Sequence, residues 1–246
     1  MGPLAASLSL PTELKYLFNE FRGFWQFDAT RIAHMLSPTV TPPSILVDVA
    51  YSLLKQNPSD WPKDAEDTSF HEPLVDSLND FLNASHLALD TSNPPIIDRE
   101  DRWYRGLRFR LLGDGTCNLH SPTCTPIKRE AVGGISFGDA SRGVEFAVPV
   151  KLDEDWPAVI AQAARSAQIL YSMNSWRKFV LIIVFRHPTL ELRFLILHRG
   201  GLTASKPLSV VGEEGKKDIL RVFLSMLMWE NGEDAGLCPD QMMVVE

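Results

Sequence analysis

Two stretches in the second half of the chain hold its longest apolar runs. Residues 178–185 read KFVLIIVF and residues 190–197 read LELRFLIL, with His187-Pro188 between them. Short apolar runs bounded by turn residues are typical of strands buried within a sheet. The pattern therefore predicts a hairpin of two central strands.

A third strand and a long helix precede this hairpin. In residues 144–151, valine and phenylalanine alternate with other side chains, which is the period of a strand. From about Asp155 the apolar spacing changes to that of a helix, with Pro157 in its first turn. The face predicted to be buried consists of Trp156, Ile160, Ala163, Ala167 and Leu170.

Further elements surround this strand–helix–hairpin unit. Strand-like pieces occupy residues 103–112, 133–137 and 208–211, and a last helix occupies residues 216–229. A helix that crosses between strands of one sheet is typical of α/β architectures. The sequence thus predicts an α/β (α+β) core in residues 101–246, with a mixed central sheet flanked by helices.

The first hundred residues have the apolar spacing of helices. The predicted helices span residues 12–23, 28–36, 43–55 and 72–87. The second is expected to start at an Asp28 N-cap. Ile45, Leu46, Val49, Leu53 and Leu54 are the predicted buried stripe of the third, and Leu74, Leu78, Phe81 and Leu82 that of the fourth. Since such stripes need a partner surface, residues 1–100 are predicted to form a helical cap that packs on the core as one compact unit.

Composition narrows the function classes. The formal net charge of −7 disfavours a dedicated nucleic-acid binder, whose surface is usually basic. Alternating arginines at positions 105, 108 and 110 fit a half-exposed strand better than a nucleic-acid contact. No apolar run approaches the ~20 residues that span a bilayer, and the start lacks the pattern of a signal peptide. Three cysteines do not make a disulfide framework, so we expect an intracellular protein, cytoplasmic or nuclear.

One family resemblance is carried by residues 103–240. A small-residue helix bearing Gln162 and Tyr171 is followed by Arg177, two strands and the turn His198-Arg199-Gly200-Gly201, with Ser205 after it. This order resembles the N-terminal accessory domain of fungal-type protein kinases, in which the turn begins with aspartate instead of histidine. The sequence lacks the kinase catalytic motifs themselves, such as the glycine-rich loop and Asp-Phe-Gly. That accessory domain in turn resembles the restriction-endonuclease-like fold, so the resemblance implies a degenerate core of this kind.

The implied fold directs attention to a lysine at the end of a central strand. Nucleases of this fold use an aspartate on one strand and (Asp/Glu)-x-Lys on the next, because two carboxylates hold the Mg²⁺ that activates water. Here the lysine corresponds to Lys151, but Pro149 stands at the second carboxylate position. Val132 or Gly133 stands where the first aspartate is expected. Both metal ligands are therefore predicted to be lost.

Other residues are candidates for chemistry at this site. Asp139 and Asp153, the first of three successive acids, are the candidate replacement ligands for a metal. Gln162 is a catalytic candidate beside Lys151, or bonds the strand of Lys151 across a buried layer. For Lys151 itself, a salt-bridge or solvent-facing role is favoured over catalysis. Separately, Arg199, Gly200 and Gly201 are predicted to bind an anion through the guanidinium and backbone N–H groups, or simply to fix a turn.

Two functions follow from these observations. The first is a non-catalytic protein-interaction or self-association module on a degenerate nuclease-like domain, with a protein partner or a second copy and no cofactor or membrane. The second is a metal-dependent nuclease or phosphodiesterase that uses Mg²⁺ and migrated acidic ligands. The lost acids and the negative charge favour the first.

Overall fold

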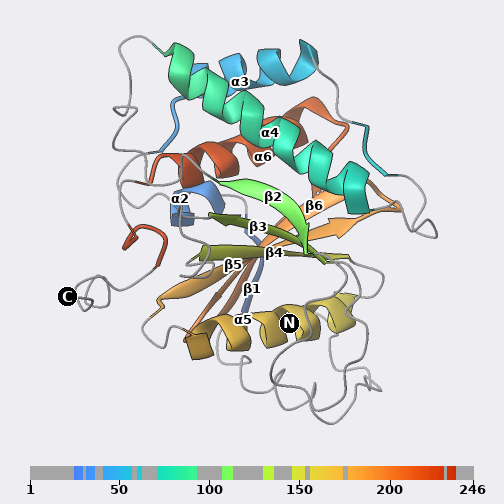
Figure 1. The fold of residues 1–246 in the computed structure, drawn as a ribbon, viewed down its shortest axis with the longest axis vertical. Coiled ribbons are helices and arrows are strands. Elements are labelled where there is room, and N and C mark those ends of the chain that lie inside the picture. Colours follow the sequence, from blue (N-terminus) through green and yellow to red (C-terminus); the bar gives the residue numbers. More distant parts are fainter. Residues whose placement is uncertain are drawn as a thin grey trace.

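A mixed sheet organises the part of the chain that the structure describes (Figure 1). The computed structural model describes residues 25–29, 32–36, 41–56, 60–62, 71–92, 107–112, 130–135, 146–152, 156–173, 177–229 and 232–236. Its strands are β1 (Trp25–Ala29), β2 (Arg108–Leu112), β3 (Glu130–Ile135), β4 (Phe146–Leu152), β5 (Phe179–Arg186), β6 (Glu191–His198), β7 (Gly201–Ser205) and β8 (Leu208–Ser209). They form one eight-stranded sheet in the order β1-β7-β6-β5-β4-β3-β2, with β8 paired to β6.

Strand directions confirm the predicted mixed sheet of an α/β fold. β4 and β5 are parallel, as are β1 and β7, and the other pairs are antiparallel. The helix α5 (Trp156–Met173) makes the crossover between β4 and β5. The hairpin of β5 and β6 also agrees with the prediction, since residues 187–190 form its turn.

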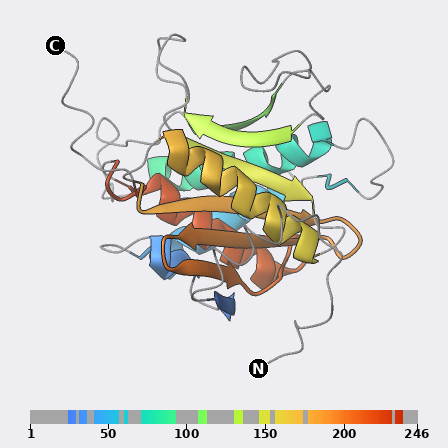
Figure 2. The same cartoon turned by 90° about the horizontal axis from the view of Figure 1, so that it is seen from below.

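Helices cover both faces of this sheet. Among the described helices, α2 (Ile32–Leu36), α3 (Ser44–Gln56), α4 (His71–Thr91) and α6 (Glu213–Leu227) lie on one face and α5 lies on the other (Figure 1). Seen from below, α5 runs diagonally across the strands (Figure 2). Among the described helices, none is both long and apolar enough to cross a membrane.

β5 has apolar side chains on both of its faces, so helices must pack on both faces of the sheet. Leu181, Ile183 and Phe185 belong to the large core beneath α4 and α6, whereas Val180, Ile182 and Val184 belong to the smaller core beneath α5. A strand that is buried on both faces loses the usual alternation and becomes uniformly apolar. This explains the run that dominates the sequence.

The N-terminal helices share the large core with the sheet. Phe81 of α4 lies edge-on to Phe223 of α6, with ring centroids 6.3 Å apart. Trp61 packs between Phe81 and Phe185, at 5.8 and 5.3 Å. The indole N–H of Trp229 donates to the Leu36 carbonyl, which fixes α2 to the end of α6. Residues on both sides of position 100 therefore contribute to one hydrophobic cluster.

β1 corrects the prediction that the first hundred residues are entirely helical. Residues 25–29 form an edge strand parallel to β7, and Asp28 lies within it at φ 57° instead of capping a helix. Aromatic residues at positions 25 and 27 alternate with polar ones, a strand period that the N-cap signal at Asp28 obscured. The predicted helix at residues 12–23 lies outside the described residues.

The buried stripe predicted for α3 is only partly right. Leu46, Val47, Ala50 and Leu54 face the core. Ile45 and Val49 are instead 72% and 38% exposed, so the true inward face is rotated from the predicted one. In α4 the predicted residues Leu74, Leu78, Phe81 and Leu82 are all buried.

An asparagine closes the outer edge of β2. The side-chain amide of Asn79 on α4 donates to the Phe109 carbonyl at 3.0 Å, and its carbonyl accepts from the Phe109 N–H at 2.9 Å. Asn79 thereby supplies both hydrogen bonds that a further strand would make to this residue. Phe109 is itself 3% exposed, so its backbone groups would otherwise have little access to water.

We predict that Asn79→Ala lowers the free energy of unfolding by about 1–3 kcal/mol, because it leaves the two buried backbone groups of Phe109 without their partner. Asn83→Ala is the matched control, since Asn83 lies one turn further along the same helix and is exposed; it should change stability by about 0.5 kcal/mol or less. Urea unfolding of both variants measures the difference. Equal stability of the two would show that the Asn79 bonds contribute nothing measurable.

Candidate functional site

Lys151 lies near the end of β4 and is buried. In the parallel pairing of β4 with β5, Val150 is level with Ile183 and Lys151 with Val184. Val150 and Ile183 belong to the core beneath α4 and α6, and Val184 belongs to the core beneath α5. Because side chains alternate along a strand, Lys151 is on the α5 face, where it is 7% exposed. Of the two roles expected for it, the solvent-facing one is therefore wrong, and the salt-bridge role stays a prediction.

The two positions at which carboxylates were expected are neighbours in the sheet. β3 and β4 are antiparallel, with Val132 opposite Pro149 and Gly133 opposite Val148. Directly opposed residues of an antiparallel pair lie on the same face, about 5 Å apart. Lys151 is two residues beyond Pro149 and therefore shares that face. The backbone thus has a register in which two acids and a lysine would converge, but valine and proline cannot bind a metal.

The candidate replacement acids lie elsewhere. Asp139 and Asp153 are outside the described residues, so their positions relative to Lys151 stay predictions. Among the residues that the structure does describe, no three His, Cys, Asp or Glu side chains gather as a metal site would require.

Gln162 is on the exposed side of α5. The helix turns its small residues toward the sheet, where Ala163, Ala164 and Ala167 are at most 1% exposed. Gln162 shares the outer side with Arg165 and Gln168. The expected bond from Gln162 to the strand of Lys151 across a buried layer is therefore wrong.

A second cation shares the row of Lys151. Arg193 of β6 is opposite Val184, so Lys151, Val184 and Arg193 form one row across three strands. The Arg193 guanidinium lies 4.6 Å from the ring centroid of Trp156, at the start of α5, and 3.4 Å from the Asp28 carboxylate. This arrangement was not predicted, because it joins β1, β6 and α5, which are far apart in the sequence.

A hydrogen bond between two of its own residues stabilises the turn that joins β6 to β7. The Gly200 N–H donates to Nδ1 of His198 at 3.1 Å, and Gly201 has φ 147°, which favours glycine. Arg199 is exposed. An anion at this turn would compete with His198 for the Gly200 N–H. The predicted anion site stays a prediction that depends chiefly on the guanidinium.

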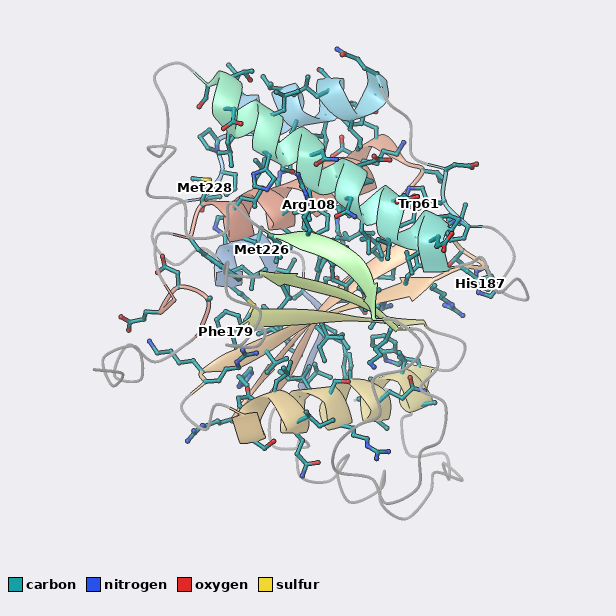
Figure 3. The ribbon with its side chains drawn as sticks, in the orientation of Figure 1. Trp61, Arg108, Phe179, His187, Met226 and Met228 are labelled. Carbon is teal, nitrogen blue, oxygen red and sulfur yellow. The ribbon has the colours of Figure 1, made fainter. Side chains whose placement is uncertain are left out.

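Lys151 and Arg199 belong to opposite ends of the sheet. Lys151 pairs with Val184, near the end of β5. Arg199 directly follows His198, and His198 pairs with Phe179 at the start of β5. Five residues along a strand span roughly 17 Å. Two labelled residues mark these ends in Figure 3: Phe179 is the first residue of β5, and His187 directly follows the last residue of β5. The catalytic and anion-binding candidates therefore do not form one site.

Tyr171 occupies the Arg199 end of the sheet. Its hydroxyl donates to the Leu197 carbonyl at 2.8 Å. Burial raises the pKa of Tyr171 from 10.0 to about 12, although the nearby guanidinium groups of Arg177 and Arg199 act in the opposite direction. Arg177 is 3% exposed. The family resemblance pointed to Tyr171 and Arg177, but only the structure shows that Tyr171 lies near the guanidinium groups of both Arg177 and Arg199.

Comparisons of the chain with protein-family models, with curated protein sequences and with solved structures find no match. The resemblance to the accessory domain of fungal-type kinases therefore stays a prediction from the sequence.

We predict that Tyr171→Phe removes a phenol that ionises near pH 12 in an ultraviolet titration of the tyrosines. The folded pKa of Tyr171 is raised above that of the unfolded chain, so its stabilising contribution is complete below pH 10.0 and is lost as the pH rises toward about 12. The variant should lose about 0.5–1.5 kcal/mol at neutral pH through the missing hydrogen bond. It should also lose part of its alkaline sensitivity. A phenol lost near pH 10 instead would contradict this assignment.

Proposed function

We propose that this chain is a non-catalytic protein-interaction or self-association module. We propose further that its core is a degenerate restriction-endonuclease-like domain, similar to the accessory domain of fungal-type kinases. The pairing of Val132 with Pro149 carries the proposal. Val132 or Gly133 stands at the expected first acid position and Pro149 at the second, and none of these residues has a side chain that can ligate a metal.

The burial of Lys151 supports the same conclusion. A lysine that steadies a phosphate or a nucleophilic water must reach the substrate, and Lys151 is 7% exposed on the face beneath α5. The outer helical layer adds positive support for protein binding, because apolar side chains of α3 and α4 are exposed there. The net charge of −7 gives no support to a nucleic-acid substrate.

A cleavage assay separates this function from a metal-dependent nuclease or phosphodiesterase. The protein is incubated with labelled DNA and RNA, single- and double-stranded, with Mg²⁺ or Mn²⁺, and metal binding is followed by calorimetry. We expect neither cleavage above the buffer rate nor saturable binding heat. Asp139→Asn and Lys151→Met should behave as the wild type does.

A defined cleavage result would contradict the proposal. Cleavage that needs the metal and disappears in Asp139→Asn would show that acids have migrated into the site. Circular dichroism of each variant confirms that it is folded, so that a lost activity is not mistaken for unfolding. Such a result would replace the proposed module with an enzyme.

A further inference from the structure

α3 and α4 lie side by side in the outermost layer of the described chain (Figure 1). Ile45 and Val49 are one helical turn apart on α3 and are 72% and 38% exposed. Leu87 of the neighbouring α4 is 47% exposed. We call the outward side of these two helices the α3–α4 face.

The apolar residues of this face are not required by the core. The inward stripe of α3 is already filled by Leu46, Val47, Ala50 and Leu54. Among the described residues, α3 is the one element with two large exposed apolar side chains, whereas Met35, Leu87, Ile169 and Val211 each occur singly on their segments. Isolated exposed residues are common on protein surfaces, whereas apolar residues grouped on adjacent helices indicate an interaction site.

The same face is acidic. α4 contains Glu72, Asp76, Asp80 and Asp90 and has no lysine or arginine. Its exposed positions include Glu72, Asp76, Asn83, Leu87 and Asp90, whose spacing places them on one side of the helix. Carboxylates thus accompany the apolar residues along the outer surface of this layer.

In the part of the chain that the structure describes, two lysines beside α3 already make contacts. Lys217 of α6 lies 3.0 Å from both Asp48 and Glu213, which ties α3 to α6. Lys55 stacks on the Tyr51 ring at 5.1 Å. These contacts hold the two lysines beside α3, whereas α4 itself has four acidic residues and no lysine or arginine.

We propose that the α3–α4 face binds a positively charged amphipathic helix of another protein. Leucine-like side chains of such a helix would cover Ile45, Val49 and Leu87, and its lysines or arginines would meet the carboxylates of α4. A second copy of this chain fits less well, because it would bring another acidic α4 and a net charge of −7. This inference rests on the proposed protein-binding function and specifies its partner.

Two synthetic peptides of equal length test whether binding requires a positively charged helix. One has leucine and lysine at helical spacing, and the other has glutamate in place of each lysine. Calorimetry with the full chain should show binding of the lysine peptide alone, with an affinity that falls as salt is raised. Equal binding of both peptides, or of neither, would overturn the proposal.

Matched variants locate the binding on the molecule. The double variant Ile45→Ser/Val49→Ser should weaken binding of the lysine peptide by about tenfold or more through lost apolar burial. Ile169→Ser removes a comparably exposed isoleucine from α5 and should bind as the wild type does. Glu72→Gln/Asp76→Asn should reduce both the affinity and its salt dependence, whereas Glu214→Gln on α6 should change neither. Binding that Ile45→Ser/Val49→Ser leaves intact would place the peptide elsewhere and refute the inference.

Light scattering of the chain alone completes the test. All of these substitutions fall on exposed side chains, so unchanged thermal midpoints are expected and confirm folding. A dimer that Ile45→Ser/Val49→Ser dissociates would show that a second copy occupies the face. That result would refute the basic partner and leave the protein-interaction function standing, whereas metal-dependent cleavage would refute the function itself.

Discussion

The two-sided burial of β5 is the constraint on which the rest of the structure depends. Its side chains enter two separate cores, so each face of the sheet must be covered by other elements. α5 covers one face, and α4 and α6 cover the other with help from Trp61. The N-terminal helices are therefore part of the structure that makes the sheet possible, because their aromatic residues complete the larger core.

The same constraint explains why Lys151 is buried. Its strand is adjacent to β5, and its side chain lies in the row that continues through Val184 to Arg193 beneath α5. A nuclease of the expected kind would need this row to open toward a substrate and would need acids at position 132 or 133 and at position 149. Here α5 covers the row and the paired positions carry valine and proline. Burial and composition both support the proposal that the core is a degenerate nuclease-like domain.

The sequence was most informative where the physical signal was local. The apolar runs of β5 and β6 and the helical spacing of α4 and α5 predicted these elements closely. β7 was missed because Gly201–Ser205 has no apolar run; it is a buried strand only because β6 and β1 pair with it on either side. Asp28 was misplaced because the same residue suits a helix N-cap and an irregular edge strand. The burial of Lys151 and the exposure of Gln162 depend on how α5 packs across the sheet, which residue spacing does not specify.

The β2 edge and the outer helices differ in how many existing contacts a binding partner would have to break. At β2 the Asn79 amide already holds the outward backbone groups of Phe109, so strand addition at that residue would first have to break two hydrogen bonds. On α3, by contrast, the core is filled without Ile45 and Val49, and covering them would disturb no contact within the fold. Association through the α3–α4 face therefore costs less reorganisation than association through the β2 edge. At the β2 edge, this difference favours the proposed helical partner over an added strand.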